Sequence, residues 1–135
     1  MRPVVRDDAR LNMEMGRLQL AATQLERVRD AMPDDPETHL LIGMLELKQA
    51  DQLQDEAERA EGRARAADAL RESIRLAPDR SAAHRELGLL AYADDEFETA
   101  CVQFRHYIEL EQRAEDATRI RDYVMELERE GHCPE

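Results

Sequence analysis

The chain has 135 residues, of which 42% are hydrophobic and only 4% aromatic, and its 31 acidic and 19 basic residues give a formal net charge of −12. This length suits one domain with a sizeable core, and the abundance of Ala, Leu, Glu and Arg favours an all-α protein. The acidic balance, with arginines interleaved among the acids, argues against nucleic acid and anionic membranes as partners, because proteins that bind phosphates present dense positive charge.

The sequence contains no candidate membrane span and no export signal. No segment approaches the roughly 18 consecutive apolar residues of a membrane span, and residues 1–8 lack the apolar core of a signal peptide. We therefore expect a cytoplasmic protein without membrane insertion, or a periplasmic or envelope-associated one if the chain is a fragment of an exported protein. The richness in Arg and Ala, with Lys48 as the single lysine, is typical of a GC-rich bacterial genome.

Apolar residues spaced three and four apart predict a series of helices. A first, weakly patterned helix is expected at about residues 3–15. The clearer helices that follow are marked, in chain order, by Leu18, Ala21, Leu25, Val28 and Met32; by Leu41, Ile42, Leu45 and Leu47; by Ala66, Leu70, Ser73 and Ile74; by Leu87, Leu90 and Ala91; by Phe97, Ala100, Phe104, Tyr107 and Leu110; and by Ala117, Ile120, Val124 and Leu127. Between them, Pro36 suits a first helical turn and Gly131 suits the position after a helix end.

Two internal matches show that these helices repeat. At an offset of 45 residues the matching pairs are Pro33 and Pro78, His39 and His84, and Gly43 and Gly88. At an offset of 34 residues they are Ala66 and Ala100, Leu70 and Phe104, and Ile74 and Ile108. The difference between the offsets indicates an 11-residue insertion in one copy. A helical period of 34 residues predicts an array of helix hairpins, which is typically a surface that holds other proteins.

These positions resemble the tetratricopeptide repeat (TPR) family, whose repeats each pair two antiparallel helices, A and B. The resemblance is carried by Gly16, Ala21, Leu25, Val28 and Pro33 in the first copy, by His39, Ile42, Gly43, Ala66, Leu70, Ser73 and Pro78 in the second, and by His84, Leu87, Gly88, Ala91, Phe97, Ala100, Phe104 and Tyr107 in the third. It departs from the family pattern in the first helix A, where Asp8 and Ala9 stand at the usual Leu and Gly positions.

The resemblance implies an all-α, right-handed superhelix of about three repeats plus a C-terminal capping helix. The expected boundaries within a single domain, 1–135, are 3–35, 36–79 with the insertion near 50–61, 80–113, and a cap at 114–130. The insertion is helical in composition, and 11 residues make about three turns, which preserves the helical register. We therefore expect longer, protruding helices in the second hairpin, with a flexible acidic loop as the alternative.

The resemblance also implies a partner-binding surface on the concave side, which helix A of each repeat lines. The residues at its ligand-facing positions are Arg6, Arg10, Met13, Leu40, Met44, Leu47, Arg85, Leu89 and Tyr92. An apolar centre with charged edges is typical of a site that binds a protein or peptide. The alternatives are that these side chains pack on each other, on a second copy of the chain or on a neighbouring domain.

One subgroup of the family binds the C-terminal carboxylate of chaperones through Lys and Asn on successive A helices. Arg6 and Arg10 fall at the first two of these positions. However, the second helix A contains no Asn, and Leu89 occupies a clamp position in the third. The resemblance therefore does not extend to that carboxylate clamp.

The sequence offers no catalytic, cofactor-binding or metal-binding motif. His39 and His84 occupy the same position of two repeats, which favours a packing role over metal binding. No pair of carboxylates stands in an apolar context that would separate their pKa values, and no phosphate loop, His-Glu-x-x-His motif or activated nucleophile is present. We expect no enzyme activity and no cofactor.

Cys101 and Cys133 are too few for a disulfide scaffold, and their spacing matches no zinc motif. The simplest interpretation is one buried thiol and one thiol in the tail, both reduced in a reducing cytosol. The alternative is a disulfide, because a cap that runs antiparallel to the last B helix returns Cys133 toward Cys101.

The sequence as a whole predicts a non-catalytic scaffold or adaptor module that binds a peptide or helix in a concave groove. Two alternatives stay open. Residues 107–110 and 114–117 look like the ends of repeat arrays appended to bacterial envelope proteins, including some metallopeptidases, which suggests an accessory domain. The other alternative is a homodimer formed through the groove or the second hairpin.

Overall fold

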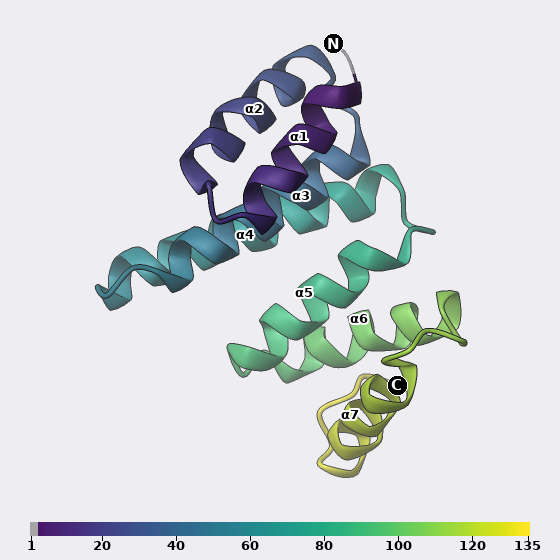
Figure 1. Cartoon of the computed structure of the whole chain (residues 1–135). Helices are drawn as coiled ribbons and strands as arrows, with labels where there is room; N and C mark the ends of the chain where they lie inside the picture. Colours follow the sequence, from purple (N-terminus) through teal and green to yellow (C-terminus); the bar gives the residue numbers. More distant parts are fainter. Residues whose placement is uncertain (1–2) are drawn as a thin grey trace. The chain divides into compact units, whose positions relative to one another are not determined.

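The computed structural model of the chain is built from helices and connecting turns (Figure 1). It describes the backbone of residues 3–135 and the side chains of residues 7–135. The helices of this described part are α1 (Pro3–Glu14), α2 (Leu18–Ala31), α3 (Pro36–Asp51), α4 (Glu56–Leu76), α5 (Ser81–Ala93), α6 (Phe97–Leu110) and α7 (Ala117–Arg129). The same residues contain no strand, so the expectation of an all-α fold is confirmed.

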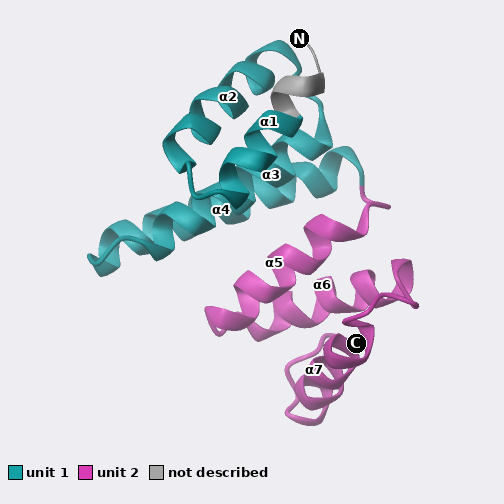
Figure 2. Cartoon of the chain, viewed as in Figure 1, with its two compact units in different colours: residues 1–77 teal, residues 78–135 magenta. Residues whose placement is uncertain are grey.

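The helices form two compact units, unit 1 (Met1–Ala77) and unit 2 (Pro78–Glu135), shown in Figure 2. In unit 1, α1 packs on α2 and α3 packs on α4. The two hairpins contact each other mainly through α2 and α3. In unit 2, α5 packs on α6 and α6 packs on α7. The grouping of all repeats into one domain, with the expected repeat boundaries, stays a prediction.

Aspartate caps and a proline determine where the helices of the second hairpin begin. The side chain of Asp35 accepts a hydrogen bond from the backbone N–H of Thr38 at 3.2 Å, and that of Asp55 accepts one from Glu58 at 3.0 Å. Such bonds satisfy N–H groups that have no partner within the helix. Pro36 lies in the first turn of α3, as the sequence predicts.

Close approach of the paired helices requires glycine in the second and third hairpins. A Cβ atom at Gly43 would lie 2.8 Å from the side chain of Leu70, and one at Gly88 would lie 2.6 Å from the ring of Phe104. Leu70 and Phe104 are completely buried. The repeated glycine and the repeated large residue are therefore two halves of one close-packed contact.

The repeated histidines fasten the turn that precedes each of these hairpins. Nε2 of His39 lies 2.7 Å from the carbonyl oxygen of Pro33, and Nε2 of His84 lies 2.8 Å from that of Pro78. In both cases the ring N–H donates to the carbonyl six residues earlier. Both rings thus have a local structural role, although His84 is buried and His39 is partly exposed.

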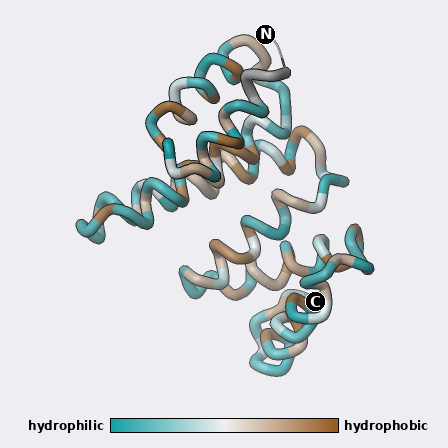
Figure 3. The backbone as a smooth tube through the Cα atoms, in the orientation of Figure 1, coloured by the Kyte–Doolittle hydropathy of each residue, from teal (hydrophilic) through white to brown (hydrophobic). Residues whose placement is uncertain are grey.

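The insertion lengthens both helices of the second hairpin. Helix α3 continues to Asp51, and α4 runs for 21 residues from Glu56, so only residues 52–55 lie outside the helices. The far end of this hairpin is hydrophilic and extends beyond α1 and α2 of the same unit (Figure 3). The alternative of a flexible acidic loop is wrong.

Each unit has its own apolar core. In unit 1 the main cluster consists of Ala9, Met13, Leu18, Ala21, Leu25, Leu41 and Leu45. In unit 2 it consists of Ala91, Ala100, Cys101, Phe104, Tyr107, Ile120, Val124 and Leu127. Most of these residues are the apolar positions from which the helices are predicted.

Cys101 and Cys133 form a disulfide, with Cα atoms 5.5 Å apart. The expectation of two free thiols is therefore wrong for this structure, and the disulfide alternative is the correct one. The pairing arises because the chain after α7 returns to α6, on which Cys101 lies.

Candidate functional site

In unit 1 the predicted partner-binding residues come from α1 and α3. Arg10 of α1 is exposed and forms an ion pair with Glu37 in the first turn of α3. Met44 and Leu47 are half-buried on α3. Arg6 lies outside the residues whose side chains the structure describes. Three of the predicted residues of unit 1 thus keep accessible surface.

Two residues predicted for this surface are buried instead. Met13 is 4% exposed and Leu40 is 8% exposed. Met13 lies one helical turn after Ala9, which is completely buried, so both residues face the unit 1 core. The expectation that the Met13 and Leu40 side chains are open to a partner is therefore wrong.

In unit 2 the predicted residues Arg85, Leu89 and Tyr92 lie on α5 at spacings of four and three, so they share one face of the helix. All three are half-buried. The ring centroid of Tyr92 lies 5.0 Å from that of Tyr123 and 5.7 Å from that of Phe97. One side of the Tyr92 ring thus packs against other aromatic rings, and the rest of the side chain is accessible to solvent.

Arg85 belongs to a network that connects three parts of unit 2. Its Nε atom donates a hydrogen bond to Oδ2 of Asp116 at 2.5 Å, and the hydroxyl of Tyr107 donates one to Oδ1 of Asp116 at 2.5 Å. Asp116 directly precedes α7, Arg85 lies on α5 and Tyr107 lies on α6. The network therefore fastens the start of α7 to both helices of the third hairpin.

The network shifts the pKa values of its two acidic groups in opposite directions. Hydrogen bonds from Tyr107 and then from Arg85 lower the pKa of Asp116 below its ordinary value. Burial, followed by the hydrogen bond to Asp116, raises the pKa of Tyr107 to about 12. At neutral pH Asp116 is therefore ionised and fully engaged, and Tyr107 is neutral, which makes neither group a ready base or nucleophile.

A cleft of about 660 Å³ opens beside this network in unit 2. It is lined by Arg85, Tyr107, Ala114, Glu115, Asp116 and Arg119. Two guanidinium groups face two carboxylates here, so the lining has no excess of positive charge that would select an anion. The sequence identifies Arg85 but not its network, because Tyr107 on α6 and Asp116 in the connection to α7 are both far from Arg85 along the chain.

Sequence reasoning also missed exposed apolar side chains in unit 1. Leu11 on α1 and Met15, directly after the end of α1, are each 54% exposed, and Leu20 on α2 is 48% exposed. Since Ala9 faces the core, Leu11, two positions later on α1, is rotated by about 200° around the helix axis and points to the opposite side. The sequence signal for this exposed surface is the four-residue spacing of Leu11 and Met15, which places apolar side chains on a second side of α1 and of the turn that follows it.

Other kinds of site find no support in the described residues. They contain no group of three or more His, Cys, Asp or Glu side chains placed to hold a metal ion. None of the helices they form combines the length and the apolar character of a membrane span.

No protein-family model and no curated protein matches the sequence. The structure, however, matches that of TTC0263, a thermophilic TPR protein from Thermus thermophilus, with a TM-score of 0.74 and 19% identity over 91% of this chain and 61% of that one. It also matches the first TPR domain of Spaghetti (RPAP3), solved with the HSP90 peptide SRMEEVD, with a TM-score of 0.67 and 20% identity over 93% of this chain and 94% of that one.

These matches show that the chain has the fold of TPR proteins, a helical repeat architecture. The fold class expected from the sequence is thereby confirmed. The chain spans about three-fifths of the length of the Thermus chain.

Proposed function

We propose that this chain is a non-catalytic protein-interaction module that binds a peptide or helix through the first helices of its hairpins, which are α1 and α3 in unit 1 and α5 in unit 2. The observation that carries the proposal is that α3 and α5 each keep a half-buried apolar pair, Met44 with Leu47 and Leu89 with Tyr92. Apolar side chains that the core leaves partly uncovered are typical of recognition sites.

The structural neighbour that was solved with a bound peptide supports peptide binding as a use of this fold. A chaperone-type carboxylate clamp is not part of the proposal, because the charge of Arg10 is paired with Glu37 and Leu89 offers no hydrogen bond. The ligand that fits the accessible side chains is a peptide or amphipathic helix with apolar anchors, received within unit 1 by Met44 and Leu47 and within unit 2 by Leu89 and Tyr92. Flexible Met44 suits anchors of varied shape.

A selection of binding peptides from a random library tests this proposal. The double variant Met44→Glu/Leu89→Glu should bind the selected peptides at least about tenfold more weakly than the wild type, because each charge replaces an apolar contact. Met125→Glu is the matched control, since Met125 is 63% exposed and lies on α7, which is not one of the proposed binding helices. Equal binding by the wild type and the folded double variant, or no enrichment of peptides at all, would contradict the proposal.

A second candidate is self-assembly, which the exposed Leu11, Met15 and Leu20 favour. Light scattering of the purified chain over a range of concentrations distinguishes the two candidates. A dimer that Leu11→Glu/Met15→Glu converts to a monomer would establish self-assembly through α1. A wild-type chain that stays monomeric would remove this candidate.

A further inference from the structure

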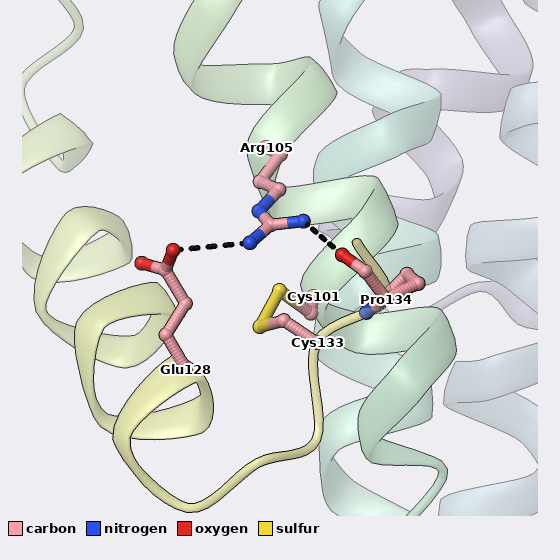
Figure 4. The surroundings of a disulfide bond; sticks show 5 residues. All are labelled: Cys101, Arg105, Glu128, Cys133 and Pro134. Carbon is pink, nitrogen blue, oxygen red and sulfur yellow. Dashed lines mark hydrogen bonds and ion pairs between the residues drawn. A yellow bond between two sulfur atoms is a disulfide. The ribbon is translucent and has the colours of Figure 1, made fainter.

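The C-terminal segment turns back onto α6 after α7 ends. Helix α7 ends at Arg129, and Gly131 adopts a φ of 80°, a left-handed conformation that glycine adopts without strain. The backbone N–H of His132 then donates to the carbonyl of Leu127 at 3.0 Å, which closes the helix end. This reversal brings residues 132–135 alongside α6 (Figure 4).

The disulfide that holds this segment has one buried and one accessible end. Cys101 is completely buried in the unit 2 core. Cys133 is only half-buried and lies outside any helix. A reagent in solution therefore reaches the bond from the side of Cys133.

The other contacts of the segment are weaker restraints. Nη1 of Arg105 donates to the carbonyl of Pro134 at 2.9 Å, and Nη2 donates to Glu128 at 3.0 Å (Figure 4). The ring of His132 lies 4.7 Å from that of Phe97, measured between centroids. Arg105 therefore holds the segment by one hydrogen bond only, because its ion pair with Glu128 connects α6 to α7, and the disulfide is the principal restraint on the segment.

The opposite end of α7 is held by different chemistry. Asp116, directly before the helix, is bonded to Arg85 and Tyr107, and neither bond depends on redox conditions. Ile120, Val124 and other apolar residues of α7 pack in the unit 2 core through contacts that do not involve the two sulfur atoms. Loss of the disulfide therefore acts on one end of the helix only.

We propose that the Cys101–Cys133 disulfide is a redox-controlled clasp. In the oxidised state it holds residues 131–135 against α6, and the ring of His132 covers Phe97. In the reduced state the segment leaves α6 and uncovers Phe97, while the start of α7 stays docked through Asp116. This inference is independent of the peptide-binding function proposed above.

The reaction that opens the clasp is exchange with a dithiol reductant. A thiolate of the reductant attacks Sγ of Cys133, the S–S bond to Cys101 breaks, and Cys101 leaves as a thiolate that takes up a proton. The second thiol of the reductant then attacks the mixed disulfide and releases Cys133 as a thiol. Two electrons and two protons pass from the dithiol to the protein, and the reductant ends as a disulfide. An oxidising compartment keeps the clasp closed, and a reducing cytosol opens it.

Hydrogen exchange of the full chain, oxidised and then reduced with dithiothreitol without denaturant, tests the proposal. Reduction should speed exchange at about residues 130–133 at least about tenfold and leave residues 117–120 and all of unit 1 unchanged. Cys133→Ser should show the fast pattern under both conditions. Glu128→Gln, which keeps the disulfide, should behave as the wild type.

Three results would overturn the proposal. Unchanged exchange at residues 130–133 after reduction would show that the other contacts suffice. Faster exchange throughout unit 2 would show that the disulfide stabilises the whole unit and does not act only on residues 130–133. Two free thiols after treatment with oxidised glutathione would show that the bond does not form. Peptide mapping after excess glutathione tests the order of attack: the adduct should be on Cys133, and an adduct on Cys101 would contradict it.

Discussion

The second and third hairpins share one plan in their interiors and differ at their ends. Each sets a glycine of its first helix against a large buried side chain of its second, Gly43 against Leu70 and Gly88 against Phe104. The second hairpin then adds a hydrophilic extension at its far end, whereas the third is followed by a cap that an ionic network and a disulfide fasten.

The interiors of the two hairpins tolerate little sequence change, whereas their ends tolerate more. The contact at each glycine has no room for one further carbon atom, so packing dictates both residues. The ends of the hairpins face water, where helix length and charge change with little effect on the core. Substitutions in the two interiors should therefore lower the free energy of unfolding more than substitutions near the start of α7. The loss should also be larger in the third hairpin than in the second.

The largest effects should follow removal of the buried large side chains. Phe104→Ala should destabilise unit 2 by about 4 kcal/mol and Leu70→Ala should destabilise unit 1 by about 3 kcal/mol, because the ring leaves the larger cavity. Urea unfolding combined with hydrogen exchange in each unit measures both values. A loss below about 1 kcal/mol at either site would show that the hairpin does not depend on this contact.

Adding one carbon atom at each glycine should destabilise the two hairpins by different amounts. Gly88→Ala should cost about 2 kcal/mol and Gly43→Ala about 1 kcal/mol, since the Leu70 side chain can change rotamer while the ring of Phe104 is rigid. The same unfolding measurement applies. Phe104→Leu in the Gly88→Ala background should restore part of the loss, and the absence of any rescue would refute the proposed clash.

The histidine–proline bond should matter more where it is buried. His84→Ala should cost about 1.5 kcal/mol, because the carbonyl of Pro78 loses its donor in a buried setting, and His39→Ala should cost about 0.5 kcal/mol. Thermal unfolding of both variants measures the difference. Equal losses would show that burial of His84 is not what gives the bond its value.

The hydrogen-bond network of Arg85, Tyr107 and Asp116 should make the stability of unit 2 fall at alkaline pH. The pKa of Tyr107 is about 12 in the folded chain and about 10 in an unfolded one. Between these values the folded state binds more protons than the unfolded state, so stability falls as the pH rises from about 10 to about 12. Tyr107→Phe should cost about 1 kcal/mol at neutral pH and should remove this part of the pH dependence.

A urea titration at several alkaline pH values checks the Tyr107 prediction, with exchange in unit 1 as the internal reference. On the acid side, the lowered pKa of Asp116 gives stability above the ordinary carboxyl range that is lost as the pH falls through the lowered value. An unchanged alkaline slope in Tyr107→Phe would show that Tyr107 is not responsible.

The sequence predicted most of the fold because the determinants are local or repeated. Helical spacing located α2 to α7, and Pro36, Gly43 and Gly88 carry physical requirements that can be recognised without a structure. Helix α1 is the exception. Its register is weakly marked, because Asp8 and Ala9 replace the usual residues, and Met13 was consequently placed on the surface when it lies in the core.

The candidate site was less predictable because its details depend on residues distant in the chain. Nothing near Arg85 indicates that Asp116 will bind it, since the two meet only when the connection to α7 has folded. The disulfide was anticipated as an alternative because an antiparallel cap makes the return of Cys133 a geometric consequence. The four-residue spacing of Leu11 and Met15 indicates a second apolar side, but whether another element covers that side is decided by tertiary packing.

The most direct test of the proposed peptide-binding surface is a hydrogen-exchange footprint of the full chain with a selected peptide bound. We predict slower exchange in α3 and α5, residues 36–51 and 81–93, because these first helices carry the proposed binding side chains. Slower exchange confined to α4 and α6, residues 56–76 and 97–110, would contradict it and would place the partner on the second helices.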